Sequence, residues 1–200
     1  MRGNKDFLEN SEILETLWNY YESHVYHHQL ENGNFVAVTK EGWIAPEDGA
    51  TEDFENLQYV DYARNTLFSL NVKTGHVQLV KENHTLENET IENLKQEIFN
   101  ELNDYIEWDY RQDATLATIF IDGTDDLTIR ICLSCHNLNL QNYWGGEWIS
   151  TFDVNHTLGT SEFSVVGRIK INNHYFESGN IQFNMVKNFE DEVKGVAVAG

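Results

Sequence analysis

Residues 163–185 read FSVVGRIKINNHYFESGNIQFNM, and their alternating pattern decides the fold. Apolar and polar side chains alternate from Phe163 to Asn172, and the same period of two returns from Ile181 to Met185. This period is typical of a strand with one apolar and one wet face. Ser178 and Gly179, between the two halves, favour a turn. The stretch therefore predicts a half-buried antiparallel hairpin.

A second motif lies upstream, where residues 142–148 read NYWGGEW. Together the two motifs resemble the sheet of the α subunit of the heterodimeric F-actin capping protein. The upstream match is carried by Asn142, Tyr143, Trp144, Gly145, Gly146 and Trp148. The more specific hairpin match is carried by Asn173, His174, Tyr175, Phe176, Glu177, Ser178, Gly179, Asn180 and Ile181. This chain departs from the family pattern with Asn173 for Val, Ser178 for Asp and Gly145 for Asn. A weaker resemblance extends back to about Phe7.

The resemblance implies an α+β fold: an antiparallel meander sheet with a helix packed across it and a short N-terminal helical stalk. In this family the α and β subunits join their sheets edge to edge. The strand that pairs across the boundary matches Asn180, Ile181, Gln182, Phe183, Asn184, Met185 and Val186. The dimer caps filament barbed ends and does no covalent chemistry. The resemblance thus implies a β-subunit partner, no catalytic residues, no cofactor and no metal.

The family's main actin contact has no counterpart in this sequence. In the α subunit it is a basic, amphipathic C-terminal extension that follows a long helix. Residues 193–200 read VKGVAVAG, and the sequence contains no Arg-Arg pair. The actin-binding residues are therefore unknown, and the chain is interpreted as a truncated or a divergent α subunit. The alternative is a pairing module or homodimer without capping activity.

Composition limits the classes of partner. A net charge of −20 disfavours nucleic acid and anionic membranes, because phosphate contacts need clustered Lys and Arg. No apolar run approaches the roughly 20 residues of a membrane helix, and residues 1–6 lack the apolar core of a signal peptide. We expect a cytoplasmic protein of the actin cytoskeleton. The length fits one domain.

Five segments are expected along the chain. They are an N-terminal helical segment (1–24), a hairpin-rich β region (25–82), a helix (83–110), an antiparallel sheet (111–187) and a C-terminal tail (188–200). Asn10 and Ser11 suit the start of the first helix, and Asn83 or Thr85 suits the cap of the second. Asn32-Gly33 predicts a type I′ hairpin turn. Residues 59–72 and 76–80 read as a second hairpin, in which the start of the long first segment is either strand or irregular.

The most enzyme-like pair is His174 with Glu177, which would suit a small acidic hydrolase if Glu177 were buried beside a pocket. The same side chains could instead order the turn by hydrogen bonds. Trp144 and Trp148 are expected to pack the sheet, with Gly145 and Gly146 marking a bulge or bend.

Cys132 and Cys135 form a C-x-x-C within an expected strand. Residues three apart on a strand point to opposite faces, so these thiols are expected to be free rather than to share a metal.

Overall fold

The computed structural model describes residues 10–46, 54–84, 88–110, 115–139, 143–177 and 179–194. The chain divides into two compact units, Met1–Thr85 and Leu86–Gly200. Length alone favoured one domain, but the first unit has a hydrophobic core of its own. The α+β class, with antiparallel sheets, is confirmed.

In the part that the structure describes, the first unit contains one helix and six short strands. Helix α1 spans Ser11–Ser23, and Asn10 caps it by accepting the Glu12 amide at 2.9 Å. The strands are β1 His27–Gln29, β2 Phe35–Ala37, β3 Trp43–Ile44, β4 Leu57–Asp61, β5 Thr66–Asn71 and β6 His76–Lys81. Strands β1 and β2 pair with each other, and β3 to β6 form a four-stranded antiparallel sheet.

A partly buried polar contact holds α1 on the core of this unit. The Tyr59 hydroxyl and the Trp18 indole N–H both donate to the Glu22 carboxylate, at 2.8 and 2.9 Å. Burial raises the pKa of Glu22, and burial together with the Glu22 charge raises the pKa of Tyr59. Tyr59 is fully buried and stacks on Phe68.

Two expected hairpins differ in detail. The prediction of a type I′ turn at Asn32-Gly33 is wrong. That turn needs a positive φ at both residues, and of the two only Gly33 has one, of 88°. Its amide bonds to the Leu30 carbonyl at 2.9 Å, and the Leu30 amide bonds to the Asn34 carbonyl at 2.8 Å, which closes a three-residue loop. Residues 59–72 are not one strand, because Asn65 at φ 50° ends a turn between β4 and β5.

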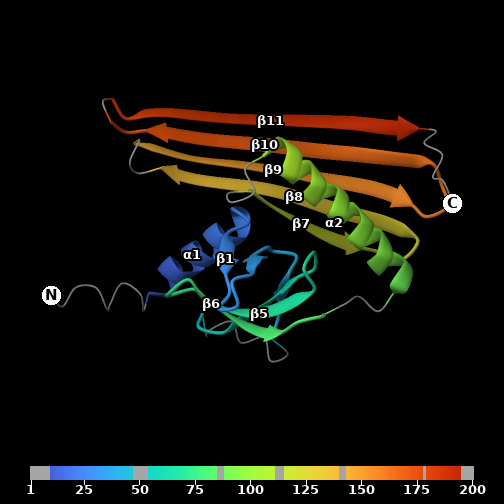
Figure 1. Cartoon of the computed structure of the whole chain (residues 1–200), viewed down its shortest axis with the longest axis horizontal. Coiled ribbons are helices and arrows are strands. Elements are labelled where there is room, and N and C mark those ends of the chain that lie inside the picture. The colour runs from blue at the N-terminus through green and yellow to red at the C-terminus, as the bar shows by residue number, and fades with distance from the viewer. Residues whose placement is uncertain are drawn as a thin grey trace. The chain divides into compact units, whose positions relative to one another are not determined.

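The second unit is a five-stranded antiparallel meander crossed by one helix (Figure 1). Helix α2 spans Glu89–Asp109. The strands are β7 Thr115–Asp122, β8 Asp126–Asn139, β9 Trp144–Thr157, β10 Glu162–Tyr175 and β11 Ile181–Lys194. Their order in space is β11-β10-β9-β8-β7, so each strand pairs with the next along the chain. Residues 188–194 were expected in a tail but belong to β11.

Helix α2 packs its apolar side against β7. Asn88 caps it by accepting the amides of Thr90 and Ile91, so the expected cap at Asn83 is wrong, and Thr85 lies outside the described residues. Ile91, Phe99 and Ile106 are buried along this side. Lys95 is buried among them, and its ammonium is 2.8 Å from the Glu92 carboxylate.

One cross-strand row shows how β11 is attached to the sheet. Ile131, Phe152, Gly167 and Phe189 lie opposite one another on β8, β9, β10 and β11. The rings of Phe152 and Phe189 meet over Gly167, with centroids 5.4 Å apart. A Cβ on Gly167 would lie 1.9 Å from Cζ of Phe189. The absence of a side chain at Gly167 therefore leaves the space that the Phe189 ring occupies.

We predict that Gly167→Val destabilises the second unit by about 1–3 kcal/mol, because the new side chain must displace the Phe189 ring. Hydrogen exchange of the β10 and β11 amides at increasing urea concentration measures this loss of unfolding free energy. The double variant Gly167→Val/Phe189→Ala removes the clash and should regain part of it. A double variant no more stable than Gly167→Val would contradict the role of this contact.

His28 gives the first unit a dependence on pH. Its side chain is 8% exposed, it lies among Tyr21 and Tyr26, and its Nε2 has no hydrogen-bond partner among the described residues. Burial lowers the pKa of His28 from 6.5 to about 4. Between these values the unfolded chain binds a proton that the folded unit does not bind. Stability therefore falls as the pH drops from 6.5 toward 4.

We predict that His28→Phe removes this acid sensitivity. In the natural chain His28 should cost the first unit about 2 kcal/mol between pH 6.5 and pH 5, at about 1.4 kcal/mol per pH unit. Hydrogen exchange of the β1 and β2 amides, corrected for intrinsic rates, reports this unit alone. The control is His76→Phe at an exposed position. Equal acid sensitivity in His28→Phe and the natural chain would overturn the assignment.

Candidate interaction surface

The two sequence motifs meet at one end of the second unit's sheet. Trp144 of β9 and Tyr175 of β10 are cross-strand partners, with ring centroids 4.7 Å apart. The Phe176 amide donates to the Tyr143 carbonyl at 3.1 Å, and the Tyr143 and Phe176 rings meet edge to face at 5.7 Å. The motifs therefore form one aromatic cluster that joins the β8–β9 and β10–β11 connections. Asn142 lies outside the described residues.

Asn180, rather than Gly179, carries the special backbone conformation of the β10–β11 connection. Asn180 has a φ of 47°, whereas the φ of Gly179 is not in the left-handed region. The Asn180 side-chain oxygen is also hydrogen-bonded to Nε2 of His174. Asparagine tolerates a left-handed φ better than most residues, and this contact holds its side chain in place. The sequence had pointed to Ser178-Gly179, and Ser178 lies outside the described residues.

His174 and Glu177 do not form a catalytic arrangement. Glu177 is exposed and accepts a hydrogen bond from the Tyr175 hydroxyl, while His174 is bonded to Asn180. Neither residue lines a described pocket. Both side chains order the connection, which is the structural role that the sequence left open.

Trp148 packs against the end of α2. It stacks on Tyr110 with centroids 5.0 Å apart, whereas Trp144 is 51% exposed. Burial, followed by the hydrogen bond between the Tyr105 and Tyr110 hydroxyls, raises the pKa of Tyr110 to about 12. Sequence reasoning missed Tyr110, because nothing in its neighbourhood indicates a partner so distant along the chain.

Gly145 and Gly146 do not mark a bulge, since the pairing of β9 with β8 and β10 runs through them without a shift. A Cβ on Gly146 would lie 2.4 Å from the side-chain oxygen of Asn173. Gly146 therefore permits a close approach of Asn173.

Cys132 is buried and Cys135 is half-buried, and neither forms a disulfide. They pair with Thr151 and Trp148 in an unshifted ladder, so they point to opposite faces as the sequence predicted.

β11 forms an exposed edge. Among the described strands it pairs only with β10, through fourteen consecutive residue pairs. The residues predicted at the subunit interface lie in its first half and are exposed: Ile181 62%, Phe183 52%, Met185 37% and Val186 51%. The edge continues to Lys194, so its second half was missed. The acidic residues 190–192 interrupt the alternating pattern, so the sequence did not predict that the strand continues.

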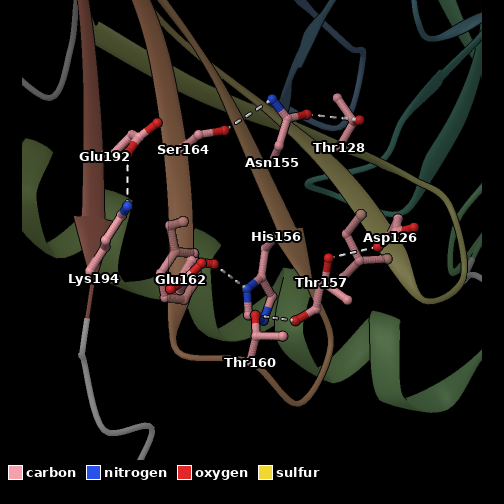
Figure 2. A pocket seen from close by; sticks show the side chains of 12 residues that line it. Asp126, Thr128, Asn155, His156, Thr157, Thr160, Glu162, Ser164, Glu192 and Lys194 are labelled. Carbon is pink, nitrogen blue, oxygen red and sulfur yellow. Dashed lines mark hydrogen bonds and ion pairs between the residues drawn. The ribbon is translucent and has the colours of Figure 1, made fainter.

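The opposite end of the sheet carries a polar groove of about 440 Å³ (Figure 2). His156 stacks on Phe163 there, and its Nδ1 is 3.2 Å from the Glu162 carbonyl. Thr157 donates to Asp126 at 2.6 Å, and Lys194 lies 3.2 Å from Glu192. These groups bond to one another across an open surface. No group of three or more His, Cys, Asp or Glu side chains suited to a metal occurs in the described part of the chain.

A larger, mainly apolar groove of about 1020 Å³ lies between α2 and the sheet. Leu94 and Ile98 of α2 face it from one side, and Ile129, Ile131 and Val154 from the other. The groove shows that α2 covers the sheet incompletely beyond β7, so an open and mainly apolar surface lies on the α2 side at Ile129, Ile131, Val154 and Phe163.

Comparisons with known proteins give a consistent result. The family model for the F-actin capping protein alpha subunit matches residues 3–198. F-actin-capping protein subunit alpha of Eremothecium gossypii is 30% identical over 65% of this chain and 46% of its own length. The Dictyostelium discoideum subunit is 21% identical over 90% of this chain and 59% of its own. The chain thus spans about half the length of these curated relatives.

The fold is similar to that of the homodimeric actin capping protein alpha subunit from Plasmodium berghei. The TM-score is 0.69 at 19% identity, over 92% of this chain and 64% of that one. Within the described residues, no helix combines the length and apolar character needed to cross a bilayer.

Asn180 gives a test of the motif end of the sheet. We predict that Asn180→Val destabilises this end by about 1–3 kcal/mol, because a β-branched residue is strained at a φ of 47°. Asn180→Gly keeps the conformation and loses only the bond to His174, so its cost should be about 1 kcal/mol. Hydrogen exchange of the Tyr175 and Ile181 amides provides the measurement.

The matched control is Gly179→Val, whose new Cβ would be in ordinary contact with Cγ1 of Ile181, at 3.7 Å, among the described residues. Its effect should be small. If Gly179→Val destabilised this end more than Asn180→Val, the conformational role of Asn180 would be wrong.

Proposed function

Because the chain belongs to the F-actin capping protein alpha subunit family, we propose that it pairs with a capping protein beta subunit and that the assembled dimer caps filament barbed ends. The exposed edge of β11 carries this proposal. A long strand with unpaired N–H and C=O groups is a template for another strand. In this proposal, the assembled dimer of alpha and beta subunits blocks the exchange of actin at the barbed end, and neither capping subunit does so alone.

The chemistry of β11 suits addition of a strand. Phe183 and Met185 point to the same face as Phe189, which is the α2 side of the sheet. A strand added at this edge would extend both the backbone ladder and this apolar face. Burying the exposed parts of these side chains contributes roughly 25 cal/mol per Å². The edge therefore offers backbone hydrogen bonds for affinity and apolar side chains for register.

Charge bears on the actin contact. The chain has 33 Asp+Glu against 13 Lys+Arg, and the β11 edge itself carries Glu190, Asp191 and Glu192. An acidic surface is a poor complement for an acidic filament. We therefore propose that the actin contact is made by basic elements of the assembled dimer outside residues 10–194. The proposed location is the cytoplasm, at the actin cytoskeleton.

We predict that Phe183→Asp weakens binding of a capping protein beta subunit at least about tenfold, because it places a charge on the apolar face beside the edge. The matched control, Gln182→Asp, adds the same charge on the opposite face, where the neighbouring residues are polar. Co-purification and light scattering measure the one-to-one complex, and elongation of pyrene-labelled actin from barbed ends measures capping. A natural chain that never forms this complex would refute the proposed partner.

A further inference from the structure

Two tryptophans flank a glycine on one face of the sheet, at its motif end. Trp144, Gly146 and Trp148 alternate along β9, and the unshifted pairing of this strand places all three on the same face. Tyr110 follows α2 directly and stacks on Trp148, so this face is the α2 side. These residues lie on the face of the sheet and not at its edge.

Each tryptophan belongs to a pair of aromatic rings. The ring centroids of Trp144 and Tyr175 are 4.7 Å apart, and those of Trp148 and Tyr110 are 5.0 Å apart. Tyr105 extends the second pair, since its hydroxyl is 3.2 Å from that of Tyr110. Trp144 is 51% exposed and Tyr105 is 46% exposed. Together with the residues between them, the two pairs form the paired-aromatic surface. Exposed aromatic patches of this kind typically mark interaction sites.

The floor between the two ring pairs is low and polar. Gly146 has no side chain, and a Cβ there would lie 2.4 Å from the side-chain oxygen of Asn173, its cross-strand partner. Asn173 is exposed, and its amide has no hydrogen-bond partner among the described residues. Trp144 and Trp148 are four residues apart, which is about 13 Å along a strand. An extended peptide can therefore lie between the ring pairs and accept a hydrogen bond from Asn173.

Each ring pair has an acidic residue beside it. Glu177 accepts a hydrogen bond from the Tyr175 hydroxyl, and Asp109 directly precedes Tyr110. Both carboxylates are exposed. The paired-aromatic surface itself contains no Lys or Arg, and the chain carries a net charge of −20. Charge complementarity therefore favours a partner that brings Lys or Arg to this surface.

A proline-rich segment fits these features. A polyproline II helix has no internal hydrogen bonds, so its carbonyl groups can accept from side chains. Such segments dock between exposed aromatic rings, and their stiff backbone loses little entropy on binding. A sugar would need several convergent polar groups, whereas the hydroxyls of Tyr105, Tyr110 and Tyr175 already bond to one another or to Glu177. An added strand would need a free edge, which this face does not offer.

We propose that the paired-aromatic surface binds a proline-rich segment of a partner protein, in the polyproline II conformation and with Lys or Arg next to the prolines. Proline rings pack on Trp144 and Trp148, and a carbonyl of the segment accepts from the Asn173 amide. The basic residues reach Glu177 or Asp109. This inference concerns a different partner from the proposed function and is tested on the chain alone.

Three synthetic peptides test the proposal by titration against the natural chain near 0.15 M salt. The probe is two Arg followed by ten Pro, which forms a polyproline II helix. In one control, alternating Gly and Ser replace the prolines, which keeps the charge but removes the helix. In the other control, two Glu replace the Arg, which reverses the charge.

We expect the probe to bind at least about tenfold more tightly than either control peptide, because it alone combines the helix with the positive charge. Equal affinity of either control peptide would overturn the proposal. So would a natural chain that does not bind the probe at about 1 mM.

Tryptophan signals show where the probe binds. The chain has five Trp residues, and single substitutions assign their indole N–H resonances. The probe should shift the resonances of Trp144 and Trp148. It should leave unchanged those of Trp18 and Trp43, which pack in the first unit. Shifts that omit both Trp144 and Trp148 would refute the site.

Trp144→Ala should weaken binding of the probe at least about tenfold, because truncating a central Trp typically costs a binding site this much. The matched control is Tyr143→Ala. Tyr143 is 43% exposed, but its ring packs on Phe176, which lies beside His174 on the opposite face. Hydrogen exchange of the β10 and β11 amides checks that both variants keep the motif end folded. Equal loss of affinity in both folded variants would overturn the assignment to the α2 side.

Discussion

Backbone hydrogen bonding along four strands of fourteen residues each is the constraint on which the second unit depends. Strands β8 to β11 pair without a register shift, so every side chain keeps its face from β8 to the edge. A mainly apolar α2 side, interrupted on β11 by Lys187 and Asp191, follows from that regularity. So does the exposed edge, because a meander that adds one strand at a time always leaves its last strand unpaired unless a helix, a bulge or another chain covers it.

Contacts between aromatic side chains reinforce the backbone pairing of the sheet in two places. At the motif end, the rings of Tyr143, Trp144, Tyr175 and Phe176 join two connections that lie far apart in the sequence. In the middle, Phe152 and Phe189 close over Gly167. Both contacts hold strands near the exposed edge in place. The His174–Glu177 pair belongs to this scaffold and not to a reaction centre.

The meander and its faces could be predicted from the sequence, because Phe163, Val165, Ile169 and Ile171 repeat every second residue. The motif residues were identified by resemblance, but their contact with one another required the fold. The second half of β11 was missed because Glu190, Asp191 and Glu192 interrupt the alternation, although backbone pairing with β10 tolerates exposed charges. The turn was expected at Ser178-Gly179, and the sequence did not indicate that Asn180 adopts a left-handed conformation with its side chain held by His174.

The order of the meander has a consequence for biosynthesis. Each hairpin joins neighbours in sequence, so the sheet can grow outward from α2 and β7 as the chain leaves the ribosome. Among the described strands of this unit, β11 is synthesised last, so it can dock on β10 after β7 to β10 have paired. The exposed edge of β11 therefore forms only after the other described strands of the sheet. This timing shortens the period in which nascent chains on neighbouring ribosomes expose it to one another.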